Sequence, residues 1–124
     1  MASKKMKVNL YGTNYTISKV EIDRYNADNS LAIQLYSWCK DYGGFNEPFA
    51  MLTVCLNDKT IKKDNMSYLD TNNCPWGEDF VEKYGLGKPT GMLGFSGYCA
   101  YPLYEWDLDK LNELMEVSKW YMQW

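Results

Sequence analysis

The polar run from Asp70 to Asn73 is the clearest candidate in the sequence for contact with a metal ion or a substrate. It places the carboxylate of Asp70 and three short polar side chains between an expected strand and an expected helix. Oxygen ligands of this kind suit a hard cation or a polar substrate. The same residue types also satisfy the backbone of a strand-to-helix turn. We therefore name Asp70 and Asn72 as candidate binding residues and keep the turn as the structural alternative.

Catalytic motifs are otherwise weak. The chain of 124 residues contains no histidine, which excludes Ser-His-Asp, Cys-His and histidine-based metal chemistry. Ser96 follows Gly94 as in a nucleophile elbow, but Tyr98 stands where that motif needs a second glycine. The segment 85–90 lacks the spacing of a phosphate-binding loop. We expect a protein that is not an enzyme and that has no catalytic residues and no cofactor.

The four cysteines do not form a metal-binding pattern. They lie 16, 19 and 25 positions apart, at Cys39, Cys55, Cys74 and Cys99, and no Cys-x-x-Cys pair is present. Structural zinc sites usually take two ligands from one short turn. We therefore expect no metal site, and we expect free thiols buried as small hydrophobic side chains in a reducing compartment.

Aromatic residues are unusually abundant, because 11 Tyr, 5 Trp and 4 Phe make up 16% of the chain. That exceeds what a core of this size is expected to hold, and Tyr and Trp are enriched at protein interfaces. Part of the set belongs in the core. Two clusters are the candidate binding residues: Tyr98, Tyr101, Tyr104 and Trp106 in one segment, and Trp120, Tyr121 and Trp124 at the end of the chain.

The charge argues against nucleic acid as a direct partner. The net charge is −3, and Arg24 is the single arginine, whereas duplex binding rests on several phosphate contacts. Residues 1–63 carry nine basic and six acidic side chains, and residues 64–124 carry four basic and ten acidic ones. The acidic half suits a basic partner surface, and an ordinary solvated face is the alternative.

The first half of the sequence predicts strands. Alternation over 6–11 and 15–22 around a turn at 12–14 predicts a hairpin, with a bulge near Ser18 and Lys19 where the apolar phase shifts. A third strand is expected over 30–39, followed by a turn-rich connection over 41–48. The segment 49–56 is apolar on both faces, which predicts a central strand.

The second half adds two helices. A short strand over 66–70 precedes a helix that Asn73 caps and Gly85 ends, with Trp76, Phe80 and Tyr84 on one face. A loop over 87–91 leads to irregular strands over 92–104. A C-terminal helix is capped by Asp107; its apolar stripe is Leu108, Leu111, Leu114, Met115, Val117 and Tyr121. The predicted fold is α+β: an antiparallel sheet of about five strands, one short helix and a C-terminal helix packed on the sheet.

Length and segment pattern predict one domain over residues 1–124, and a homo-oligomer is compatible with that size. The polar N-terminus lacks the apolar core of a signal peptide, and no apolar run is long enough to cross a membrane. We therefore expect a soluble protein in the cytoplasm of a bacterial host cell, without membrane contact.

Three segments resemble a family of short proteins of unknown function from Gram-positive bacteria and their mobile elements: Asp70–Trp76, Gly85–Gly91 and Ser96–Tyr104. The resemblance spans roughly residues 6 to 108. Small acidic proteins in that setting are often similar to inhibitors of host defence, including anti-CRISPR proteins.

Together these observations favour a non-enzymatic binding protein of a phage or mobile element. It would inhibit a bacterial defence protein, such as a CRISPR nuclease, through aromatic anchors and an acidic surface. The alternative is a protein that sequesters a small molecule or nucleotide signal between aromatic rings.

Overall fold

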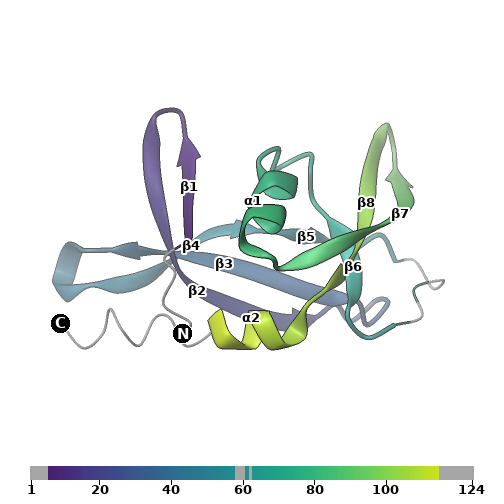
Figure 1. Ribbon diagram of the computed structural model, residues 1–124, viewed down its shortest axis with the longest axis horizontal. Coiled ribbons are helices and arrows are strands. Elements are labelled where there is room, and N and C mark those ends of the chain that lie inside the picture. Colours follow the sequence, from purple (N-terminus) through teal and green to yellow (C-terminus); the bar gives the residue numbers. More distant parts are fainter. Residues whose placement is uncertain (1–5, 58–60, 62, 115–124) are drawn as a thin grey trace.

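The computed structural model describes residues 6–57, 61 and 63–114, which form an α+β fold (Figure 1). The fold class is confirmed, and the strands of these residues form two four-stranded antiparallel sheets where one sheet of about five was expected. One sheet has the order β1-β2-β3-β4: β1 (Met6–Leu10), β2 (Thr13–Arg24), β3 (Leu31–Cys39) and β4 (Phe45–Met51). The other has the order β5-β6-β8-β7: β5 (Thr53–Val54), β6 (Met66–Leu69), β7 (Gly87–Ser96) and β8 (Cys99–Trp106).

The N-terminal hairpin and its bulge are confirmed, but Thr13 and Asn14 of the expected turn belong to β2. Strands β1 and β2 are joined by Tyr11 and Gly12, which both have positive φ, 52° and 84°, as in a type I′ turn. In the β2–β3 pairing Ile17 is opposite Ser37 and Lys19 is opposite Tyr36. Ser18 is therefore the extra residue of the bulge, at the position where the apolar phase shifts.

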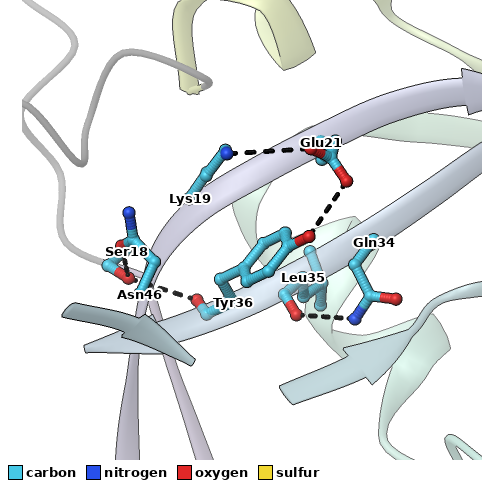
Figure 2. Close-up of polar contacts among 7 residues, drawn as sticks. All are labelled: Ser18, Lys19, Glu21, Gln34, Leu35, Tyr36 and Asn46. Atoms are coloured by element: carbon cyan, nitrogen blue, oxygen red, sulfur yellow. Dashed lines mark hydrogen bonds and ion pairs between the residues drawn. The ribbon is translucent and has the colours of Figure 1, made fainter. Parts of the chain in front are cut away.

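Figure 2 shows how this bulge is held. The buried Ser18 hydroxyl donates a hydrogen bond of 2.7 Å to Oδ1 of Asn46 on β4. Next to it, the Tyr36 hydroxyl donates to Glu21, which also lies 3.7 Å from the Lys19 ammonium. The Asn46 side chain on β4, which is not adjacent to β2 in the sheet, thus accepts the hydrogen bond of the Ser18 hydroxyl that the bulge buries.

The prediction of a central strand over 49–56 was wrong. The segment divides at Leu52, so that β4 is an edge strand of the first sheet and β5 is an edge strand of the second. Leu52 donates its N–H to the Ile33 carbonyl and accepts from the Asp70 N–H, both at 2.9 Å. The segment is apolar on both faces because it serves two sheets in turn.

Two expected loops contain strand residues. Strand β4 begins at Phe45, after a short 3-10 helix over Asp41–Gly43, and β7 begins at Gly87. Each of these segments contains a proline, Pro48 or Pro89, which argues against a central strand but is tolerated at the edge of a sheet. Both strands are edge strands, which explains why turn-forming residues are accommodated there.

Helix α1 (Gly77–Tyr84) starts later than expected, because Trp76 and not Asn73 occupies the N-cap position. Gly85 ends the helix with a φ of 65°, as predicted. The aromatic face is confirmed, and it continues into the first sheet. Successive ring centroids lie 5.1–5.8 Å apart along the series Tyr15, Phe49, Trp76, Phe80 and Tyr84. This aromatic series fixes α1 to the sheet.

Helix α2 (Leu108–Leu114) packs against β2. The Asp107 carboxylate accepts a hydrogen bond of 3.1 Å from the N–H of Lys110, which confirms its role as the cap. Leu111 and Leu114 are buried in the main core. The remaining residues of the predicted stripe, Met115, Val117 and Tyr121, lie outside the described residues.

The main core joins both sheets and both helices, and Trp106 is the largest side chain that is completely buried in it. Its indole N–H donates to the buried hydroxyl of Ser67 at 2.8 Å, and its ring stacks on Tyr104 with centroids 5.4 Å apart. A second, smaller core lies around Tyr68, Tyr101 and Leu103. Strand β8 therefore contributes residues to both cores.

We expect Trp106→Phe to lower the free energy of unfolding by at least about 2 kcal/mol, because it removes ring volume and leaves the Ser67 hydroxyl without its donor. Ser67→Ala removes the other partner. The double variant should lose about 1 kcal/mol less free energy of unfolding than the sum of the losses in the two single variants. Urea unfolding of the three variants measures this coupling, and strict additivity would contradict the proposed hydrogen bond.

Candidate protein-interaction surface

The predicted aromatic site contains both exposed and buried residues. Tyr98, at the tip of the β7–β8 hairpin, is fully exposed, whereas Tyr101, Tyr104 and Trp106 are buried at 7%, 4% and 1% exposure. These three rings are core residues and offer little surface to a partner, which corrects their inclusion in the predicted site. The tail residues of the prediction, Trp120, Tyr121 and Trp124, lie outside the described residues.

Asp70 is explained by its own turn. Its buried carboxylate accepts hydrogen bonds from the backbone N–H of Asn73 at 3.1 Å and from the Asn73 side-chain amide at 2.9 Å. Its carbonyl accepts from the Cys74 N–H at 2.8 Å. Asn72 is exposed. The geometry therefore favours the structural alternative at Asp70, and ligand binding by Asn72 stays a prediction.

The cysteines are free thiols, and Cys74 alone among them is fully buried. Burial, with a smaller contribution from the negative charge of Asp70, raises the pKa of the Cys74 thiol to about 11. Its reactive thiolate is therefore scarce at neutral pH. Among the residues that the structure describes, no three Cys, Asp or Glu side chains are grouped so that they would hold a metal ion.

The β7–β8 hairpin carries four of the nine large hydrophobic side chains that are exposed among the described residues. Residues 89–104 contain no charged side chain. Within this stretch Met92, Leu93, Phe95 and Tyr98 are exposed at 59%, 56%, 70% and 109%. Contiguous apolar groups on the surface mark interaction sites when they gather in one place, whereas single ones do not. An uncharged hairpin with four such residues within seven positions is therefore a candidate interaction site.

Strand register shows which of these residues share a face. Leu93 is opposite Pro102 and Phe95 is opposite Ala100. Along β8, Ala100 and Pro102 alternate with the same phase as Tyr104, so that all of them lie on one side of the sheet. We call Leu93, Phe95, Ala100 and Pro102 the hairpin face. It extends the core-facing side of β8 outward into solvent.

The opposite side of the hairpin packs on the second core. A side chain at Gly94 would meet the Tyr68 ring at 2.6 Å and Leu56 at 2.7 Å, so glycine is the residue that fits there. Tyr101 and Leu103 on this side are buried in the second core. Of the two sides, the hairpin face is therefore the one on which Leu93 and Phe95 are exposed.

A groove lies at the base of the hairpin face, between α1 and β7. It measures about 360 Å³ and is lined by Glu78, Glu82, Gly87, Lys88, Pro89 and Tyr104. The buried Tyr104 hydroxyl lies 3.4 Å from the Glu78 carboxylate. Burial, followed by the negative charges of Glu78 and then Glu82, raises the pKa of Tyr104 to about 12. We call this the α1–β7 groove.

Sequence reasoning missed two further exposed tyrosines at hairpin tips. Tyr11 joins β1 to β2, and Tyr42 joins β3 to β4; they are 104% and 98% exposed, with φ of 52° and 55°. Both hairpins project from the body of the molecule (Figure 1). The available signal was a tyrosine directly before a turn glycine, in Tyr11-Gly12 and Tyr42-Gly43.

Three cavities lined by described residues do not favour a nucleotide. A pocket between β1 and α1, lined in part by Lys7, Lys83 and Trp76, measures about 150 Å³, below the usual range of ligand sites. The α1–β7 groove and a neighbouring groove of about 340 Å³ are larger. Two carboxylates and one lysine, Lys88, line each of these grooves, and this negative balance disfavours a phosphate.

A family model described as a domain of unknown function, DUF4313, matches residues 19–122. The chain belongs to the DUF4313 family. The match confirms the resemblance to a family of unknown function, and the DUF4313 description assigns no activity. No curated protein and no solved structure matches the chain. No described helix is long and apolar enough to cross a membrane.

The Tyr11 turn provides a test of backbone strain. Asparagine adopts the left-handed conformation more readily than tyrosine and is preferred in type I′ turns. We expect Tyr11→Asn to raise the free energy of unfolding by about 0.5 kcal/mol, and Tyr11→Val, which is β-branched, to lower it. Thermal unfolding compares the variants. Equal stability of all three proteins would show that this residue is not strained.

Tyr104 provides a test at alkaline pH. Its pKa is about 12 in the folded protein and about 10 when unfolded, so between these values only the folded chain keeps the proton. The free energy of unfolding should therefore fall as the pH rises from about 10 to 12, and it should fall less steeply in Tyr104→Phe. Urea unfolding across this range measures both slopes, and identical slopes would contradict the assignment.

Proposed function

We propose that this DUF4313 protein is a non-enzymatic binding protein that contacts a partner protein through the β7–β8 hairpin. The observation that carries the proposal is the uncharged stretch 89–104 with its exposed Met92, Leu93, Phe95 and Tyr98. Water solvates these side chains poorly, and a partner surface that covers them gains free energy without having to desolvate a charge.

The hairpin has the features of an interaction anchor. Burial of Leu93 or Phe95 in a partner contributes about 1.5–3 kcal/mol each, which is enough for a few residues to dominate binding. The base of the hairpin is held by the buried Trp106 and Tyr104, so that its position relative to the domain is set before binding. A preformed anchor loses less conformational entropy on association.

The finer part of the proposal concerns the partner. We propose a bacterial defence protein, such as a CRISPR nuclease, as the target of a protein carried by a phage or mobile element. The acidic balance of residues 64–124, with ten acidic and four basic side chains, supports this choice. Such nucleases hold nucleic acid in positively charged channels, which attract an acidic protein.

The double change Leu93→Ser and Phe95→Ser tests the hairpin. We expect it to weaken partner binding at least about tenfold, because two anchoring side chains lose their apolar surface. The protein, immobilised at its N-terminus, is used to capture partners from bacterial host lysates, and the affinity of each captured protein is then measured by calorimetry.

Tyr98→Ser and Tyr42→Ser form a matched pair, because both tyrosines are fully exposed at hairpin tips on different sheets. Tyr98→Ser should weaken binding and Tyr42→Ser should not. A partner that binds wild type and the Leu93→Ser, Phe95→Ser variant equally would refute the hairpin as the binding site. Failure to bind a CRISPR nuclease or to protect phage DNA in cells would remove the finer proposal alone.

A further inference from the structure

Along β8 the hairpin face continues into the α1–β7 groove, while the register of β7 shifts between Pro89 and Leu93. Tyr104, opposite Pro89, lies on the same side of the sheet as Pro102, opposite Leu93. Moving inward along β8, the exposed apolar residues therefore give way to Pro89 and the Tyr104 ring, both of which line the groove. A partner segment on the hairpin face has the groove directly beside it.

The groove has a net negative charge, because two glutamates and one lysine, Lys88, line it. Glu78 and Glu82 are four positions apart on α1, so both lie on one side of the helix and repel each other. In the part of the chain that the structure describes, neither carboxylate has a Lys or Arg nitrogen within 4.0 Å; the ion pairs there are Lys19–Glu21 and Lys63–Glu105.

The two lysines nearest in sequence, Lys83 and Lys88, form no ion pair with these carboxylates. Lys88 is opposite Glu105, which places both side chains on the side of the sheet away from Tyr104. Lys83 lies over the Tyr84 ring at 5.4 Å, on another part of α1. Lys88 lines the groove, but among the described residues neither Glu78 nor Glu82 forms an ion pair with this sheet or this helix.

Helix stability accounts for one carboxylate but not for the other. Glu78 lies in the first turn of α1, where the helix dipole favours a negative charge. Glu82 lies in the last turn, where the dipole disfavours it and a neighbouring acid repels it. Glu82 therefore destabilises the isolated helix, which points to a role outside the domain.

We propose that the partner segment on the hairpin face is cationic and places a lysine or arginine side chain in the α1–β7 groove, between Glu78 and Glu82. This inference rests on the proposed function, whose partner it describes chemically. The aliphatic part of such a side chain packs on the exposed Pro89, and its charge meets both carboxylates. Arginine fits best, since its planar guanidinium binds carboxylates with two hydrogen bonds.

Two synthetic octapeptides provide the probe, one alternating leucine with arginine and the other alternating leucine with glutamate. In an NMR titration of the full chain, we expect the arginine peptide to shift the amide signals of Glu78, Glu82, Lys88 and Leu93. The glutamate peptide should leave them unchanged. Binding of the arginine peptide should weaken with added salt, as expected for paired charges at the rim of an interface.

Matched double variants separate local from general charge effects. Glu78→Gln with Glu82→Gln removes two charges from the groove and should weaken the arginine peptide at least about tenfold. Asp109→Asn with Glu113→Gln removes two exposed charges from α2 and should leave the affinity within about twofold. Thermal unfolding of both variants establishes that they are folded.

The inference is overturned if the arginine peptide does not bind, if the glutamate peptide binds equally well, or if both double variants weaken binding alike. These outcomes are distinct from a failure of the proposed function. Loss of a captured partner in Leu93→Ser with Phe95→Ser, combined with unchanged capture by Glu78→Gln with Glu82→Gln, would keep the hairpin as the anchor and exclude a cationic segment.

Discussion

The two sheets are joined through one buried residue, and the rest of the structure depends on that junction. Leu52 separates β4 from β5 and is fully buried. Its N–H bonds to Ile33 in the first sheet, and its carbonyl bonds to Asp70 directly after β6 of the second. The neighbouring Thr53 hydroxyl accepts the Ile33 N–H at 3.1 Å. With a single residue between the strands, the relative position of the sheets is fixed by hydrogen bonds that water cannot reach.

From this junction the positions of α1 and the hairpin follow. The Asp70 turn sets the start of the segment that leads to α1, and the aromatic series from Tyr15 to Tyr84 holds the helix on the first sheet. The Tyr84 hydroxyl accepts the Lys7 N–H at 2.9 Å, which ties the end of α1 to the edge strand β1. The other side of α1 then faces β7, and this arrangement creates the groove that Glu78 and Glu82 line.

Strand β8 shows how one pattern serves both stability and recognition. Its alternate residues Ala100, Pro102, Tyr104 and Trp106 lie on one face, yet Trp106 is completely buried and Ala100 is exposed. The face passes from core to solvent because the covering elements end before the hairpin does. Apolar surface that stabilises the fold at one end is left free at the other, next to two carboxylates of which helix stability accounts for Glu78 only. The proposed partner-binding function and the proposed cationic partner both derive from this continuity.

The sequence alone determined those features that depend on neighbouring residues: the α+β class, the first hairpin, the bulge at Ser18, the helix end at Gly85 and the cap at Asp107. Each follows from local periodicity or backbone preference. The tertiary structure decided which apolar residues are covered. Residues 49–56 belong to two sheets, Tyr104 and Trp106 are buried, and Leu93 and Phe95 are exposed. Alternation assigns a residue to a face of a strand, but only the packing of distant segments determines where along that face the core ends.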